Sequence, residues 1–141
     1  MAALAVAVVT GLVWQRTNGR IRGIRGAPPG TPEARAADTG SVLTGAELGL
    51  PLGQRATLVQ FSTAFCAPCR ATRRTLAEVA GMVDGVAHVE IDAESHLDLV
   101  RRLDIRRTPT VLVVGPDGRI AKRASGQPRK ADVIAAVGDL P

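Results

Sequence analysis

The stretch QFSTAFCAPCRATRRTL, residues 60–76, carries both cysteines of this 141-residue chain, Cys66 and Cys69, with two residues between them. It begins inside a short apolar run rich in β-branched and aromatic residues, ATLVQFS at 56–62, which is typical of a strand. It continues into a segment whose apolar residues recur with helical spacing. The sequence therefore predicts a strand, a short connection and a helix that begins with the cysteine pair.

The spacing of the pair has chemical consequences. Residues three apart on a helix are neighbours, so the sulfurs of Cys66 and Cys69 are expected within bonding reach without backbone movement. Pro68 suits the first helical turn, where a missing N–H costs nothing. The free N–H groups and the positive end of the helix dipole favour a thiolate at Cys66, and a lowered thiol pKa is what a nucleophile toward disulfides requires. Cys69 falls on the apolar side of the helix and suits the second, resolving role.

A C-x-x-C pair is also half of a zinc site or part of a copper-carrying site. Zinc needs two more ligands, usually a second cysteine pair or two histidines. The chain has no other cysteine, and His88 and His96 fall in a predicted strand and at a predicted helix start. The residues therefore favour a thiol–disulfide motif between a strand and a helix, with no metal and no other cofactor expected.

In the rest of the predicted domain, residues 41–141, segments with strand patterns alternate with segments whose apolar residues have helical spacing. The order of strands and helices mixes a parallel crossover half with a hairpin half, and the hairpin turns at GPDG, 115–118. This order predicts an α/β fold with a mixed central sheet flanked by helices. Beyond the first strand and its helix at 66–83, strands are predicted at 85–92, 110–114 and 119–125, and helices at 95–105 and 129–140.

The N-terminal region divides into an apolar run and a polar one. Residues 1–14, MAALAVAVVTGLVW, are apolar except for Thr10, and several arginines follow. A membrane span wants about 20 apolar residues, so a membrane anchor, a signal peptide and a buried core helix all remain open. The anchor is favoured because the charge lies on the wrong side of the run for a signal peptide. Residues 15–40, rich in Gly, Pro, Arg and Ala, predict a flexible linker.

Charge sets the expected orientation and excludes one class of partner. Arginines that flank a span stay in the cytoplasm, so a single-pass membrane protein with a cytoplasmic domain is expected. The net charge is +5, of which residues 1–40 carry +3 and residues 41–141 carry +2. The domain has no basic run interleaved with aromatic residues, so nucleic-acid binding is not expected. The chain is expected to act as a monomer.

With these residues placed, residues 42–140 resemble the thioredoxin family. The resemblance is carried by FCAPCR at 65–70 after a buried strand and by TPT at 108–110 before the next one. It implies a thioredoxin fold, here preceded by an N-terminal apolar helix, and a protein-disulfide reductase with Cys66 and Cys69 as its catalytic residues.

The resemblance also implies a substrate groove. In the family, the proline of TPT is cis and faces the dithiol, and the backbone of the preceding threonine pairs with the substrate chain. Gly126 falls where the family has a glycine that lines this groove, and Phe65 replaces the usual tryptophan, either as packing or as an apolar rim. The expected substrate-binding residues are Phe65, Pro68, Thr108, Pro109 and Gly126.

Two positions depart from the family pattern. Thioredoxins carry a buried aspartate six residues before the first cysteine that helps to move the proton of the second thiol, and Gln60 stands there. A lysine that often accompanies the aspartate is matched by His88. Glutamine cannot act as a base at pH 7, whereas a neutral imidazole can. We hypothesise that His88 takes part in proton transfer; the alternative is a strand residue with a satisfied hydrogen bond.

Three functions are compatible with these features. The first is a membrane-tethered reductase of protein disulfides, which is recharged by a thiol electron donor that the sequence does not identify. The second is a related thiol reductase of the cytochrome-maturation type outside the cytoplasm. The third is a redox-inert interaction module on a thioredoxin scaffold, which the presence of both cysteines and of Pro109 disfavours.

Overall fold

The computed structural model describes residues 2–24 and 42–141. From residue 56 onward its strands and helices follow the order that the sequence predicts, with boundaries that differ by a few residues at most element ends. The elements are α1 (Ala2–Thr17), β1 (Ile21–Gly23), α3 (Gly45–Leu48), β2 (Ala56–Ser62), α4 (Ala67–Met82), β3 (Val86–Asp92), α5 (Leu97–Arg102), β4 (Thr110–Val114), β5 (Ile120–Ser125) and α6 (Lys130–Gly138).

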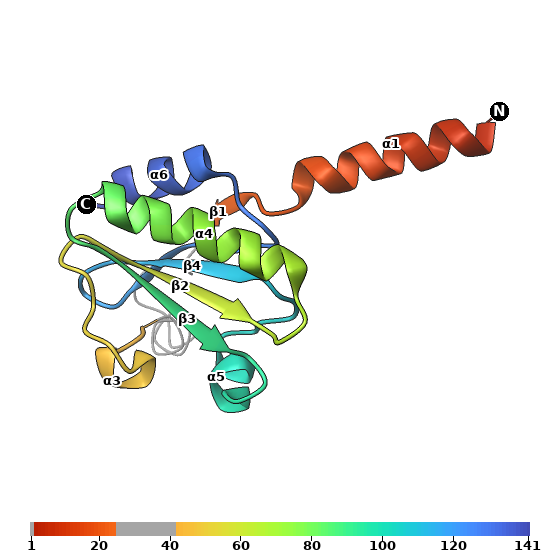
Figure 1. The fold of residues 1–141 in the computed structure, drawn as a ribbon. Helices are drawn as coiled ribbons and strands as arrows, with labels where there is room; N and C mark the ends of the chain where they lie inside the picture. The colour runs from red at the N-terminus through yellow and green to blue at the C-terminus, as the bar shows by residue number, and fades with distance from the viewer. Residues whose placement is uncertain (1, 25–41) are drawn as a thin grey trace, which may run out of the picture.

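The strands form one mixed sheet in the order β1-β5-β4-β2-β3 (Figure 1). β2 pairs in parallel with β3 through the α4 crossover and antiparallel with β4, and β5 pairs antiparallel with β4. In this register Phe61 lies opposite Thr110, so the chain that enters β4 passes beside the end of β2. The predicted mixed sheet flanked by helices is therefore confirmed.

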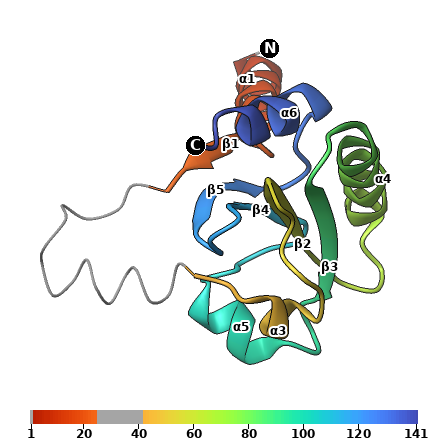
Figure 2. The same ribbon diagram turned by 90° about the vertical axis from the view of Figure 1, so that its left-hand side faces the viewer.

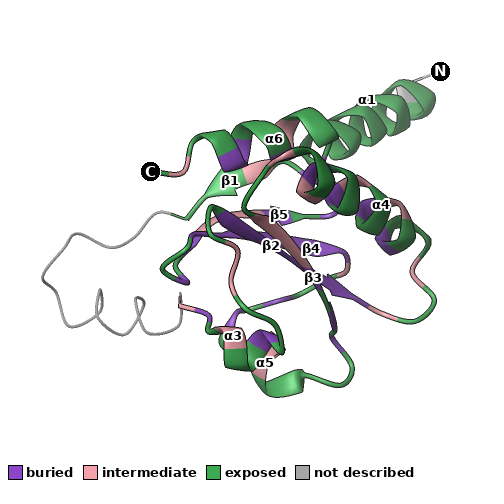
Figure 3. Ribbon diagram, turned by 60° about the vertical axis from the view of Figure 1, so that its left-hand side comes forward, coloured by how far each residue is buried: buried purple, intermediate pink, exposed green. Residues whose placement is uncertain are grey.

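Two apolar layers enclose the sheet, because successive side chains of a strand point to opposite faces. Leu58 packs with Leu76 of α4 and Val133 of α6 on one face, while Val59 and Phe61 pack toward α3 and α5 on the other. Every residue of β2 is buried, which explains why its sequence is a continuous apolar run rather than an alternating one. Figure 3 shows the buried strands in purple between helices whose outer surfaces are green.

One helix departs from its expected pattern. The sequence predicts a buried stripe on the last helix that includes Ile134 and Leu140. In the structure Val133 and Val137 are buried and Leu140 is partly buried against the same core, whereas Ile134 remains 37% exposed. Ala136 takes the third buried position of α6, because its small side chain lets the helix approach the sheet closely.

The N-terminal helix α1 projects away from the rest of the described chain in Figure 1, and Figure 2 views it nearly along its axis. Its large apolar side chains are exposed, Leu4 at 69% and Trp14 at 60%, so it is not a core helix. In residues 2–24 and 42–141 no helix has both the length and the apolarity needed to cross a membrane. The single-pass anchor expected at residues 1–14 is thus not supported.

The segment after α1 is more ordered than the sequence predicts. The predicted linker begins at residue 15, but α1 continues to Thr17 and Ile21–Gly23 forms β1 along the edge of β5. Without β1, β5 would be an edge strand; the pairing gives hydrogen-bond partners to backbone N–H and C=O groups of β5. Gly19 makes the turn between the two with a positive φ of 74°, which favours glycine. Residues 25–40 of the predicted linker lie outside the described residues.

Candidate active site

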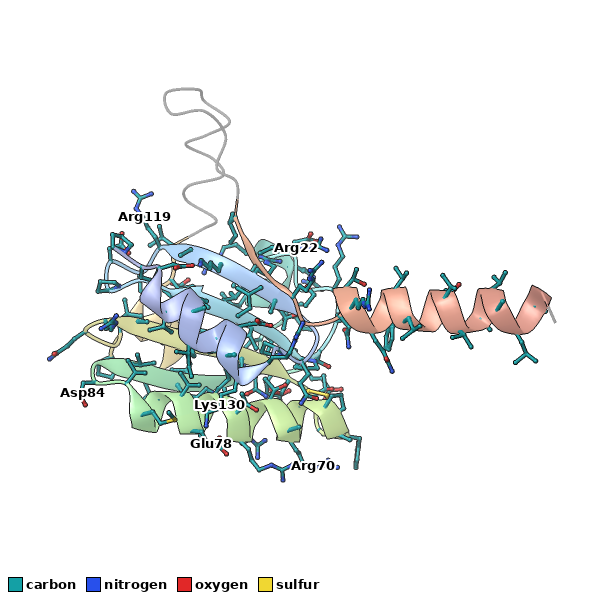
Figure 4. All side chains as sticks on the ribbon, turned by 90° about the horizontal axis from the view of Figure 1, so that it is seen from above. Arg22, Arg70, Glu78, Asp84, Arg119 and Lys130 are labelled. Atoms are coloured by element: carbon teal, nitrogen blue, oxygen red, sulfur yellow. A yellow bond between two sulfur atoms is a disulfide. The ribbon has the colours of Figure 1, made fainter. Side chains whose placement is uncertain are left out.

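The cysteine pair lies at the start of α4, after the loop that connects this helix to β2. Cys66 is the N-cap of α4, and its Sγ accepts the backbone N–H of Cys69 at 3.2 Å. Pro68 occupies the first turn. The two sulfurs are joined in a disulfide with a Cα–Cα distance of 5.2 Å, so the structure describes the oxidised form. Figure 4 draws the bond in yellow.

The two cysteines differ in exposure. Cys66 is half-buried, whereas Cys69 is 1% exposed and packs on the inner face of α4. A large disulfide-bearing molecule can therefore approach Cys66 but not Cys69. In the reduced protein the N–H of Cys69 and the positive end of α4 would both favour the Cys66 thiolate.

A cis peptide bond stands across from the pair. The Thr108–Pro109 bond is cis, and Pro109 is buried. The hydroxyl oxygens of Thr108 and Thr63 lie 3.1 Å apart, which ties the proline loop to the loop that carries Cys66. The carbonyl of Pro109 accepts the N–H of Gly126 at 2.7 Å. The structure thus brings the cysteine loop, the TPT segment and Gly126 to one end of the sheet.

Phe65 next to the first cysteine is fully exposed. Its side chain does not pack in the apolar core. Of the two roles expected for Phe65, its position is compatible with the apolar rim. The other phenylalanine of the chain, Phe61, lies four residues earlier in β2 and is completely buried. The two aromatic side chains therefore have opposite environments, a contrast that mutagenesis can use.

Gly126 is not an open groove residue. It is buried, and its φ of 100° favours glycine. A Cβ at this position would collide with the side chain of Asn18 and lie 2.5 Å from the guanidinium of Arg107. The N-terminal segment thus covers part of the surface that the family resemblance assigns to substrate. Sequence reasoning missed Asn18, because nothing local indicates that residue 18 packs against residues 107 and 126.

A hydrogen-bonded chain runs from the second cysteine to His88. The amide nitrogen of Gln60 donates to the carbonyl of Cys69 at 2.8 Å and to the hydroxyl of Ser62 at 2.9 Å. Since a carbonyl only accepts, the amide oxygen of Gln60 faces His88, 3.3 Å from its Nε2. Nε2 therefore carries the hydrogen, and Nδ1 of the neutral ring is the available base.

Burial sets the protonation of this histidine. Desolvation lowers the pKa of His88 below its ordinary value, with the charge of Glu90 opposing and that of Arg73 reinforcing the shift. Burial alone would raise the pKa of Glu90, but hydrogen bonds from Arg73 and Ser62 and the charge of Arg73 hold it low. The ion pair between Arg73 and Glu90 measures 2.6 Å. At pH 7 the imidazole is neutral and the Glu90 carboxylate is charged.

The described residues contain no group of three or more His, Cys, Asp or Glu side chains that could hold a metal ion. Both cysteines are engaged with each other in the disulfide. A disulfide between neighbouring cysteines can exchange with the thiols or the disulfide of another molecule.

Comparisons with known proteins agree with this geometry. The family model for Thioredoxin matches residues 49–139. Thioredoxin H5 of Oryza sativa subsp. japonica is 29% identical over 69 residues, which cover 49% of this chain and 51% of that protein. The chain thus spans about half the length of this curated relative.

Solved structures show the same fold. The crystal structure of chloroplastic thioredoxin z is 30% identical with a TM-score of 0.58, and the match covers 68% of this chain and 88% of that one. Oxidised mitochondrial thioredoxin 3 from Saccharomyces cerevisiae is 20% identical with a TM-score of 0.54, over 62% of this chain and 80% of that one. The second likeness supports the fold alone.

Proposed function

Because this chain belongs to the thioredoxin family, we propose that it is a thiol–disulfide oxidoreductase that reduces protein disulfides through Cys66 and Cys69. The observation that carries the proposal is the asymmetry of the pair. An accessible sulfur sits at the N-cap of α4 and a buried sulfur lies one turn further, opposite a cis-proline loop. This is the arrangement that a nucleophile and its resolving partner need.

The reaction proceeds in two exchanges. The Cys66 thiolate attacks one sulfur of the target disulfide, forms a mixed disulfide and releases the other target sulfur as a thiolate. The Cys69 thiolate then attacks Cys66 Sγ, releases the second target sulfur and leaves the Cys66–Cys69 disulfide. Two electrons pass to the target, whose two thiolates take up protons. A thiol electron donor must then reduce the disulfide again.

The substrate is proposed to lie across the cis-proline loop. Phe65 precedes Cys66, Pro68 lies between the two cysteines and both are exposed, while Thr108 is half-buried beside the cysteine loop. An extended target segment that pairs with the backbone of Thr108 would present its sulfur to Cys66. Pro109 is buried beneath this loop and accepts the N–H of Gly126, which the N-terminal segment covers.

Reduction of insulin disulfides with dithiothreitol as the electron donor tests the proposal. The wild-type protein is expected to accelerate the reduction, and loss of this activity in Cys66→Ala would support the mechanism. A wild-type protein without activity would favour the redox-inert module instead.

His88 is proposed to assist the proton transfer of Cys69 as a neutral base, with Gln60 orienting the ring through its hydrogen bond to Nε2. Replacing it by glutamine is expected to raise the pKa of Cys69, because the nearest neutral base is lost. In the wild type, the resolving step should slow only as the pH falls through the lowered pKa of His88, since the neutral imidazole exists above it. The rate loss in His88→Gln should be roughly tenfold or more at pH 7.

The measurements are the pKa of Cys69 by thiol titration in the reduced protein and the rate of mixed-disulfide resolution between pH 5 and 8. His96→Gln is the matched control, because His96 is exposed at the N-cap of α5 and bonds the carbonyl of Asp92. An unchanged Cys69 pKa in His88→Gln would leave His88 as an ordinary strand residue.

The second part of the proposal is that α1 attaches the domain to a membrane on the cytoplasmic side. The support is a helix whose large apolar side chains are exposed along its length and which carries Arg16 in its last turn. An exposed apolar surface of this kind is typical of membrane or protein contact. An extracytoplasmic placement is the alternative, and the accessibility of a tag at residue 30 separates the two.

Vesicle flotation tests the attachment. The full chain is expected to float with lipid vesicles, and the variant Val9→Asp/Leu12→Asp is expected to lose at least about 90% of the bound fraction because it buries charge in the apolar phase. Leu50→Asp is the control, since Leu50 is equally exposed but lies outside α1. Equal flotation of both variants would contradict the attachment.

A further inference from the structure

Four arginines gather around one cavity beside the proposed substrate groove. The cavity has a volume of about 500 Å³ and lies between β1, β5 and the proline loop, with Arg20, Arg22, Arg107 and Arg123 in its wall. Figure 4 labels Arg22 next to the base of α1. The same figure places Arg70, at the start of α4, on the side from which α1 projects and Asp84 on the opposite side. The cavity therefore lies toward the active-site end of the sheet.

The charge of this arginine pocket is not neutralised by carboxylates. Arg107 donates to the side-chain oxygen of Asn18 and to the carbonyl of Ser125, and Arg123 donates to backbone carbonyls at 2.6 and 3.1 Å. These acceptors are all uncharged. Among the residues that the structure describes, neither Arg20 nor Arg22 has an ion pair. Asp104, which acts on Arg123, already pairs with Arg106 at 2.9 Å. Asp132 and Asp139 line a neighbouring pocket with Arg20 and Arg22, but they pair with Arg129 and Lys122.

Elsewhere on the domain, basic side chains meet acids. Arg73 pairs with Glu90, Lys122 with Asp139 and Lys130 with Glu78. The arginine pocket thus holds four guanidinium groups, none of which has an ion pair among the described residues. Burial lowers the pKa of Arg123, which Asp104 partly opposes, but a guanidinium stays charged at neutral pH. An anionic group placed in the pocket would offset the repulsion between the guanidinium groups and the solvation that Arg123 loses on burial.

The pocket is connected to the substrate groove through the backbone. Arg107 directly precedes the cis Thr108–Pro109 bond. Ser125, which accepts from Arg107, directly precedes Gly126, whose N–H bonds Pro109. An extended chain advances about 3.3 Å per residue, so a target segment beside Thr108 would bring residues only a few positions from its cysteine over the pocket.

We propose that the arginine pocket binds carboxylate side chains of the protein substrate, so that disulfides flanked by acidic residues are reduced preferentially. The inference rests on the proposed function and names its substrate class. Guanidinium groups match a carboxylate in bidentate geometry, so the arginine side chains of the pocket suit this ligand. Arg22 lies in β1 and Arg20 directly precedes it, so the pairing of β1 with β5 makes the N-terminal segment part of the proposed substrate site.

Competition between matched peptides tests the inference. The substrates are disulfide-linked homodimers of a short cysteine peptide that carries three Glu, three Gln or three Lys beside the cysteine. The reduced full chain is expected to reduce the Glu peptide roughly tenfold faster in kcat/KM than the Gln peptide at low salt, and the Lys peptide most slowly. This preference should collapse at about 1 M salt, where charges are screened.

Variants locate the preference. In Arg20→Gln/Arg22→Gln the ratio of the Glu to the Gln rate is expected to fall toward one. Arg55→Gln/Arg101→Gln removes the same charge from exposed sites away from the pocket and should keep the wild-type ratio. A ratio near one in the wild type overturns the inference while leaving the proposed function intact.

Inactivity toward every peptide would instead overturn the proposed function. In that case a binding measurement tests the arginine pocket on its own. A labelled Glu peptide without cysteine should bind the oxidised protein and lose affinity in Arg20→Gln/Arg22→Gln, whereas absence of binding overturns the inference. If the double variant loses only its affinity for vesicles rich in anionic lipid, the pocket serves a membrane surface and the inference is likewise wrong.

Discussion

Replacement of Cys66 by alanine is expected to lower the rate of disulfide reduction at least about a thousandfold, to the uncatalysed background. Cys66 is the cysteine that a protein disulfide can reach, because Cys69 is 1% exposed beneath α4. Without Cys66 no mixed disulfide can form, because the target disulfide cannot reach the buried thiol of Cys69. Insulin reduction and single-turnover reduction of a disulfide peptide both measure this loss.

Cys69→Ala is the informative partner of this variant. It should also lose turnover, but it should accumulate the covalent adduct between Cys66 and the target, since nothing resolves it. Thermal unfolding of each reduced variant checks that the fold is retained. Substantial turnover in Cys66→Ala, or an absence of adduct in Cys69→Ala, would contradict the assigned roles.

The second large effect is expected in the core. Replacing Phe61 by alanine should lower the free energy of unfolding by about 3–5 kcal/mol, because it removes the largest fully buried side chain of β2. A domain of this size is stable by only about 5–15 kcal/mol in total, so the variant should unfold at much lower denaturant concentration. Urea unfolding of the reduced protein measures the change without the disulfide.

Phe65→Ala is the control that the chain itself provides. Phe65 is fully exposed, so its removal should change the unfolding free energy by less than about 0.5 kcal/mol. It should instead weaken peptide reduction, because an apolar surface beside Cys66 is lost. Equal destabilisation by the two substitutions would show that the exposed and buried environments are assigned wrongly.

Much of the fold could be predicted because the periodicities of its central elements are strong. β2 reads as a continuous apolar run since β3 and β4 flank it and helices cover both faces. The face of α4 that is buried, from Cys69 to Val79, follows helical spacing in the sequence. These features depend on local patterns and on the burial that the patterns require.

The contacts of the N-terminal segment could not be predicted, because they depend on distant pairing. β1 is three residues, Ile-Arg-Gly, with no alternation to mark it, and its partner in β5 is about a hundred residues away. Asn18 reaches Arg107 only after that pairing is formed. The consequence is large, since this segment covers Gly126 and completes the arginine pocket.

The link between His88 and the cysteine pair could be predicted only in part. Parallel pairing of β2 and β3 places His88 beside Leu58, and the side chain of Gln60 spans the remaining distance. The family resemblance pointed to both positions, but the sequence could not reveal that the amide bonds the carbonyl of Cys69 rather than its sulfur. The assistance that we propose for His88 is therefore indirect.

The most direct measurement is the pH dependence of alkylation of the two thiols in the reduced wild-type protein, followed residue by residue by mass spectrometry. The account predicts that Cys66 reacts first, with a pKa below the ordinary cysteine value of about 8.5, and that Cys69 reacts far more slowly. Faster reaction of Cys69, or equal reaction of both cysteines with ordinary pKa values, would contradict it.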